Sequence, residues 1–134
     1  MRVVLDTNVL ISGAFFSGLP SRILDACVAG TFRLLLTPEI VDEYRQVGEQ
    51  FTRTRPNLDF ERLLNLLVAQ AVLVHAQHLD RPLCRDPGDE KFIACAIAGK
   101  ADVIVSGDRD VLAVSGQMGI LVLRPREFAT CYME

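Results

Sequence analysis

Two aspartates stand where an apolar run of the sequence ends. Asp6 directly follows the run 2–5, and Asp108 comes shortly after the run 103–105. Both runs lack polar alternation, which indicates strands buried on both faces of a parallel sheet. The carboxyl ends of such strands meet at one edge of an open α/β sheet, where ligands bind. We therefore expect the two carboxylates to face one crevice.

Two further acids could join them. Asp89 opens a helix predicted over 89–99, and Glu43 lies inside a helix predicted to begin at Pro38, with Thr37 as its N-cap. Taken singly, each acid also has a structural interpretation, as a turn residue, as a favourable charge in a first helical turn or as a solvated helix residue. The case for a shared site therefore rests on the four acids together.

The chemistry of such a set follows from its charge. Two carboxylates about 5 Å apart repel by about 3 kcal/mol at an effective dielectric constant of about 20, so four in one crevice require a cation. Oxygen ligands without histidine or cysteine favour Mg²⁺ or Mn²⁺, which could activate a water for attack on a phosphodiester. The chain has no serine-hydrolase, P-loop or dinucleotide-binding motif that would favour other chemistry.

Strands and helices alternate along the chain. After the first strand, the predicted elements are a loop over 12–20, a helix ending at Gly30, a strand over 32–36, the helix from Pro38, a helix capped by Asn57, a strand over 72–75, a polar connection over 77–88, the helix 89–99, the strand 103–105, a short helix over 110–115, a strand over 120–123 and a helical turn led by Pro125. This order predicts a three-layer α/β/α fold with a mainly parallel five-stranded sheet.

Composition narrows the class of protein. With 134 residues, 50% of them hydrophobic and 23% charged, the chain fits one domain over 1–134. Its 14 Lys and Arg against 17 Asp and Glu give a net charge of -3, which excludes a histone-like binder that coats nucleic acid. No apolar stretch approaches the ~20 residues of a membrane helix, and no signal peptide is apparent. We expect a cytoplasmic protein without a membrane partner.

The acidic motifs, in this order, resemble a PIN domain and, within that superfamily, the toxins of bacterial and archaeal toxin–antitoxin systems. The motifs are DTNVL at 6–10, PEIVDEY at 38–44, Asp89 ahead of FIACA at 92–96, and SGDRD at 106–110. The resemblance extends from Met1 to about Phe128. It implies a five-stranded parallel sheet and a ribonuclease that cuts single-stranded RNA with Mg²⁺ or Mn²⁺.

The resemblance also implies roles for individual residues. The catalytic, metal-binding acids are Asp6, Glu43, Asp89 and Asp108, and the polar supporting residues are Asn8 and Ser106. Ser106 stands where threonine is more usual, and it keeps the hydroxyl. Asp86 and Asp110 are further acids near the site, and the sequence leaves open whether they join the metal shell or only support it.

Substrate and partner contacts are less specific in the sequence. Several basic residues lie near the acids or near the break before the third helix, and they could hold RNA phosphates or simply be solvated: Arg53, Arg55, Arg62, Arg81, Arg85, Lys91 and Arg109. Nine aromatic residues without a tryptophan indicate no obvious base-stacking platform. The resemblance further implies a homodimer and a small antitoxin that would block the acidic crevice.

Two alternatives stay open. The first is a catalytically silent PIN-like interaction module, against which the intact set of four acids argues. The second is another Mg²⁺-dependent phosphoryl or phosphodiester hydrolase of α/β fold. A receiver domain requires a late lysine after a strand, and a haloacid-dehalogenase-like phosphatase requires a second aspartate at the position of Asn8. Both requirements are unmet here.

Overall fold

A five-stranded, all-parallel sheet forms the centre of the protein. The computed structural model describes residues 1–133. The strands follow the order β3-β2-β1-β4-β5, and their bounds are β1 Arg2–Leu5, β2 Arg33–Leu36, β3 Val72–Leu73, β4 Val103–Val105 and β5 Val122–Leu123. The first strand therefore lies in the middle, paired with β2 on one side and β4 on the other. The predicted parallel five-stranded sheet is confirmed.

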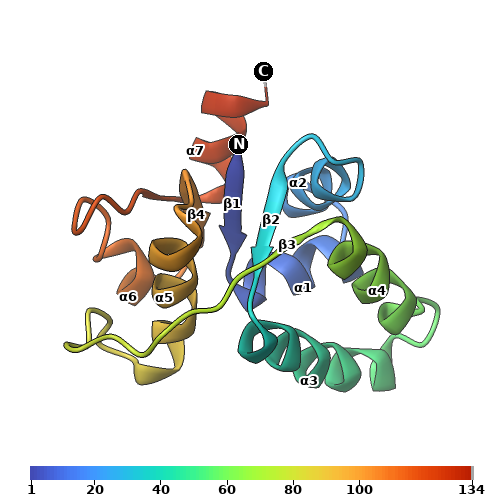
Figure 1. The fold of residues 1–134 in the computed structure, drawn as a ribbon. Helices are drawn as coiled ribbons and strands as arrows, with labels where there is room; N and C mark the ends of the chain where they lie inside the picture. The colour runs from blue at the N-terminus through green and yellow to red at the C-terminus, as the bar shows by residue number, and fades with distance from the viewer. Residues whose placement is uncertain (134) are drawn as a thin grey trace.

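Helices cover this sheet and extend beyond it. Their bounds are α1 Thr7–Phe15, α2 Leu19–Val28, α3 Pro38–Thr54, α4 Phe60–Gln70, α5 Glu90–Gly99, α6 Arg109–Leu112 and α7 Pro125–Tyr132, with a 3-10 turn, η1, at Pro87–Asp89. Helix α5 packs on β1 and β2, and α2 packs on α1 and α7. In Figure 1, α1 and α3 begin near the carboxyl ends of β1 and β2, and α3 and α4 extend to one side of the sheet. The α/β class predicted from the sequence is confirmed.

The loop predicted over 12–20 is wrong for its first part, because α1 runs through Phe15 before the chain turns. A glycine inside a helix suggested a break, but Gly13 has a packing role. A Cβ at this position would lie 2.6 Å from the carbonyl oxygen of Pro20 at the start of α2. The glycine therefore lets the two helices approach closely, and this contact decides the local structure.

Other boundaries moved by a few residues. Asp59, not Asn57, caps α4, and its Oδ1 accepts the backbone N–H of Arg62 at 3.1 Å. The helix predicted over 89–99 begins with the 3-10 turn, and the short helix predicted over 110–115 lies at Arg109–Leu112. The strands predicted over 72–75 and 120–123 are each reduced to two residues. These are edge strands with one partner each, so short pairing is sufficient there.

The core lies beneath the carboxyl edge of the sheet. The apolar side chains of β1 and β4 are buried, with at most 1% exposure in Val3–Leu5 and Val103–Val105. Tyr44 of α3 is also fully buried, and its hydroxyl donates to the carbonyl of Leu5. This bond fixes α3 against the last residue of β1. No helix in residues 1–133 is long and apolar enough to cross a membrane.

Candidate metal centre

Asp6 follows β1 without an intervening loop and is the N-cap of α1. Its Oδ1 accepts the backbone N–H of Val9 at 2.9 Å, and its own N–H donates to the carbonyl of Val105 at 3.2 Å. The side chain is only 4% exposed. Burial raises the pKa of this carboxyl, and hydrogen bonds from Ser106 and Val9 counteract part of that rise. The carboxylate is therefore held rigidly at the junction of the two central strands.

Ser106 joins Asp6 to the second aspartate of the predicted pair. Its buried hydroxyl donates to Oδ2 of Asp6 and accepts the backbone N–H of Asp108 at 3.0 Å. Asp108 in turn caps α6, with Oδ1 accepting the N–H of Asp110 at 2.7 Å. A single hydroxyl thus orients the ends of β1 and β4 relative to each other.

Three carboxylates converge beside this junction. Oxygen atoms of Asp89, Asp108 and Asp110 lie within 4.8 Å of one another. Within residues 1–133, Oδ2 of Asp89 is the buried side-chain oxygen or nitrogen that has no hydrogen-bond partner. Burial and the neighbouring acids raise the pKa of Asp89 to about 6. A buried acceptor without a donor, surrounded by like charges, fits a bound cation of the oxygen-preferring kind.

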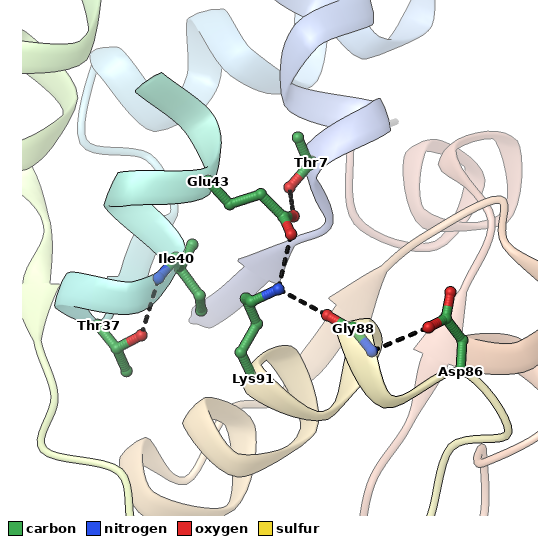
Figure 2. Close-up of polar contacts among 7 residues, drawn as sticks. All are labelled: Thr7, Thr37, Ile40, Glu43, Asp86, Gly88 and Lys91. Carbon is green, nitrogen blue, oxygen red and sulfur yellow. Dashed lines mark hydrogen bonds and ion pairs between the residues drawn. The ribbon is translucent and has the colours of Figure 1, made fainter. Parts of the chain in front are cut away.

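Glu43 lies on the flank of this cluster and is already paired. Its Oε2 accepts the hydroxyl of Thr7, and its Oε1 lies 2.6 Å from Nζ of Lys91. Lys91 also donates to the carbonyl of Gly88 at 2.7 Å, so its ammonium group bridges α3 and the turn that carries the third acid (Figure 2). The ion pair keeps Glu43 near the carboxylates while neutralising its charge.

The segment before α5 is shaped by two other acids. Oδ1 of Asp86 accepts the N–H of Gly88 at 2.9 Å and so caps the 3-10 turn that ends in Asp89 (Figure 2). Glu90 accepts the N–H groups of Leu83 and Cys84 at 2.7 and 2.9 Å. Asp86 therefore supports the position of Asp89 from the exposed side of the turn, whereas Asp110 lies in the carboxylate cluster itself.

The remaining residues singled out in the sequence lie farther from the cluster or point to solvent. Asn8 is exposed in the first turn of α1. Arg85 is exposed next to Asp86, and Arg109 is exposed in the first turn of α6. Arg53 and Arg55 are exposed at the far end of α3. Only Arg85 and Arg109 are thus adjacent in sequence to acids of the site.

The contact between Lys91 and Glu43 is the feature of the site that the sequence indicated least. The residue lies two positions after Asp89, which marks it as near the acids, but nothing in that spacing shows that it reaches across to α3. Its side chain is 11% exposed, against 29% for its partner Glu43. A lysine directly after two acids is the one signal that the sequence offered.

The sheet order and the position of the acids define an α/β protein with an acidic sheet edge that is a candidate metal site. Two adjacent central strands end in a buried aspartate and a serine-bound aspartate, and a third acid with an unsatisfied buried oxygen lies beside them. Comparison with known proteins identifies the family of the chain. A family model described as PIN domain matches residues 2–110, a range that contains all the acids discussed above. The chain belongs to the PIN domain family.

Two individual proteins are similar to the chain. An uncharacterized protein, MJ1680, of Methanocaldococcus jannaschii is 29% identical over 119 residues, covering 85% of this chain and 75% of its own length. The solved structure of a PilT N-terminus domain protein, SSO1118, from Sulfolobus solfataricus P2 covers all of this chain and 95% of its own, with a TM-score of 0.50 and 16% identity. The second match shows a shared fold. PIN domains are generally nucleases, so the fold is of nuclease type.

Proposed function

We propose that the protein is a Mg²⁺- or Mn²⁺-dependent endoribonuclease that cleaves single-stranded RNA. The observation that carries the proposal is Oδ2 of Asp89, a buried carboxylate oxygen without a hydrogen-bond donor among the described residues, next to Asp108 and Asp110. Membership in a family that consists generally of nucleases supports the same conclusion. The absence of histidine and cysteine from the cluster favours a hard divalent ion over zinc.

Asp89, Asp108 and Asp110 would hold the ion, with Asp6 beside them and Glu43 on the flank. A bound divalent ion supplies a water of lowered pKa and neutralises charge on the phosphate and the leaving oxygen. The chain's own residues do the rest of the work. Ser106 keeps Asp6 and Asp108 in fixed orientations, and Asp86 fixes the turn that ends in Asp89.

Positive charge next to the acids would position the substrate. Lys91 already donates a hydrogen bond to Glu43, and Arg109 is exposed beside Asp108. A phosphate bound at the carboxylates would lie near these two cations. Their role in the proposal is to hold the phosphodiester beside the carboxylates, where its own charge would otherwise be repelled.

A cleavage assay tests the proposal. Single-stranded RNA, double-stranded RNA and single-stranded DNA are incubated with the protein in Mn²⁺ or in EDTA. We expect cleavage of single-stranded RNA in Mn²⁺ alone, and its loss in Asp108→Asn. Asp42→Asn is the matched control. The side chain of Asp42, on α3, is 80% exposed, so this substitution removes the same charge outside the cluster. Cleavage that persists in EDTA would overturn the metal-dependent mechanism.

Metal binding has a readout that does not depend on activity. Mn²⁺ should raise the melting temperature of the wild-type protein and of Asp42→Asn much more than that of Asp108→Asn. Equal shifts in all three would place the ion elsewhere. A metal-induced shift without cleavage of any nucleic acid would instead favour the catalytically silent interaction module.

The narrower biological role stays a prediction. A toxin would arrest growth when it is expressed alone, and co-expression of the gene next to its own would restore growth if that gene encodes the antitoxin. The predicted homodimer is tested by sedimentation equilibrium of the purified chain. Neither experiment bears on the metal centre, so the nuclease proposal can stand if the toxin prediction fails.

A further inference from the structure

Helices α1 and α3 lie side by side and run in the same direction away from the metal centre. Thr7 contacts Glu43 at the beginning of the pair, and Phe15 contacts Phe51 at its end, with ring centroids 5.5 Å apart. Both contacts join positions 36 residues apart, so the register is constant along the pair. Eight helical residues span about 12 Å. A straight seam of that length therefore leads from Glu43 to an aromatic cluster.

The far end of the seam carries an exposed ring beneath a cation. Phe16 is 44% exposed, and its ring meets Phe51 edge-on at 6.3 Å. The guanidinium of Arg55 lies 4.6 Å from the centroid of Phe16 and 5.6 Å from that of Phe51. Within residues 1–133 Arg55 forms no ion pair, and its side chain donates to Thr54 at 3.2 Å. The cluster thus presents a planar π surface and an uncompensated positive charge.

The cluster is held firmly from behind. Phe15 packs between Phe51 and Phe60, with centroids 5.5 and 5.6 Å away. Gly48 lets Phe60 of α4 reach α3, because a Cβ there would lie 2.1 Å from the ring. Phe16 therefore rests on a rigid support and has little conformational entropy to lose when a ligand stacks on it.

The face of α3 that carries Glu43 has neutral polar residues after it, and the exposed acid Glu49 lies about 120° away around the helix. Asn8 and Ser12 of α1 lie four residues apart on one face, and Phe16, the C-cap of α1, follows four residues later. On α3, Gln50 and Thr54 follow Glu43 by seven and eleven residues, which places them on its face of the helix, and both are exposed. A polyanion lying on this path meets neutral polar side chains and then the positive charge of Arg55.

We propose that Phe16 and Arg55 form a stacking subsite for a base of single-stranded nucleic acid, which lies along the α1–α3 seam with one phosphate at the metal centre. The inference rests on the nuclease function proposed above. Proteins that bind single strands without sequence preference combine an aromatic face for a base with basic groups for the backbone. The cation above an exposed ring, at one end of an uncharged path from an acidic centre, has this chemistry.

Tryptophan substitution gives a direct test, because the chain contains no tryptophan. Phe16→Trp places the only indole at the proposed subsite, and Leu66→Trp places it on α4, where Leu66 is 49% exposed. Both variants are titrated with oligouridylate, oligoadenylate and the matching DNA strands. EDTA is present to stop cleavage, and the salt concentration is kept low. We expect quenching of the Phe16→Trp emission and a constant emission from Leu66→Trp. If RNA and DNA quench the Phe16→Trp emission alike, the subsite is supported, and any discrimination between RNA and DNA arises at the metal centre.

Affinity gives a second, independent measure. We expect Phe16→Ala and Arg55→Ala to weaken binding of an oligonucleotide of about twelve residues by about tenfold, in line with base–aromatic stacking. The loss should be smaller for a mononucleotide, which is too short to reach both ends of the seam. Phe16→Tyr, which keeps the ring, should restore the affinity, and thermal melting shows whether each variant is folded.

Failure of the subsite is distinguishable from failure of the nuclease function. If the oligonucleotide binds and is cleaved but the Phe16→Trp emission and the Phe16→Ala affinity do not change, the subsite is overturned and the nuclease stands. If Phe16→Ala alters only the sedimentation of the protein, the patch is a protein contact, which also overturns the subsite. If the wild type neither binds nor cleaves single strands, the nuclease function fails and the subsite with it.

Discussion

Nζ of Lys91 lies 2.6 Å from Oε1 of Glu43, although the two side chains come from helices 48 residues apart in the sequence. The ammonium group is the positive charge closest to this acid of the candidate centre. Glu43 shares its other oxygen with the hydroxyl of Thr7. A divalent ion that binds Glu43 as a ligand would therefore compete with Lys91, which is already paired with this carboxylate.

Replacement of Lys91 should make the centre bind metal more tightly. Lys91→Met keeps the length of the side chain and removes its charge, which frees Glu43 and increases the negative potential. We expect Mn²⁺ affinity, measured by calorimetric titration, to rise about fivefold, the upper range for a partly exposed ion pair. Arg45→Ala is the control, since it removes an ion pair of 3.1 Å with Glu61 elsewhere on α3. Weaker Mn²⁺ binding by Lys91→Met would contradict the competition.

The metal-free protein should lose stability as the pH rises from about 4 to 6. Burial, then Asp108 and other acids, raise the pKa of Asp89 to about 6, whereas in the unfolded chain this carboxyl titrates near the ordinary aspartate pKa of 3.8. Ionisation is thus disfavoured in the folded state, and the stability present below pH 4 is lost as the folded group titrates. Because Asp89 is partly exposed, we expect an effect of about 1 kcal/mol.

Urea denaturation in EDTA at pH 4.5 and pH 7 measures this loss. Asp89→Asn should show a smaller loss and should be more stable than the wild type at pH 7. Some pH dependence remains in the variant, because burial also raises the pKa of Asp6. An unchanged pH dependence in Asp89→Asn would contradict the assignment of the shift to this carboxyl.

Asp6 has a structural role that separates its two obvious replacements. Asp6→Asn keeps an oxygen that can accept the N–H of Val9 and so preserves the N-cap of α1. Asp6→Ala loses the cap and leaves the buried hydroxyl of Ser106 without its acceptor, so we expect about 1–2 kcal/mol of destabilisation. Thermal melting in EDTA should rank Asp6→Asn at or above the wild type and Asp6→Ala below it. Equal losses in both variants would mean that the negative charge itself stabilises the fold.

Gly48→Ala should destabilise the protein even though alanine is the better helix former. The new methyl group would lie 2.1 Å from the ring of Phe60, so α3 and α4 must separate. We expect a net loss of about 1–3 kcal/mol by urea denaturation, since overpacking outweighs a propensity gain of about 1 kcal/mol. The double variant Gly48→Ala with Phe60→Leu provides the control, because the smaller side chain should recover part of the loss. No recovery would place the strain elsewhere.

The sequence was most informative where burial alone decides the structure. The uninterrupted apolar runs predicted β1 and β4 correctly, because strands covered on both faces have no polar side to show. The residues that follow those strands, Asp6 and Ser106 with Asp108, then had to lie at one edge of the sheet, where the structure has them. That the acids converge could be predicted for this reason.

The sequence was least informative where contacts between elements that are distant in the chain decide the local structure. Gly13 suggested a break until its contact with Pro20 explained why α1 continues through it. Asp86 and Asp110 were indistinguishable as neighbours of the site, and only the direction of each side chain shows that Asp110 joins the cluster while Asp86 caps a turn. The bond from Lys91 to Glu43 depends on how α3 and α5 are placed, which no local spacing contains.

The hydrogen bond between Ser106 and Asp6 joins residues 100 positions apart. The two halves of the centre therefore meet only after β4 has been synthesised and has paired with β1. A chain still emerging from the ribosome can pair β1 with β2 and so place Asp6 near Glu43, but it lacks the aspartates that follow β4. The order of translation thus withholds the assembled centre from nascent chains.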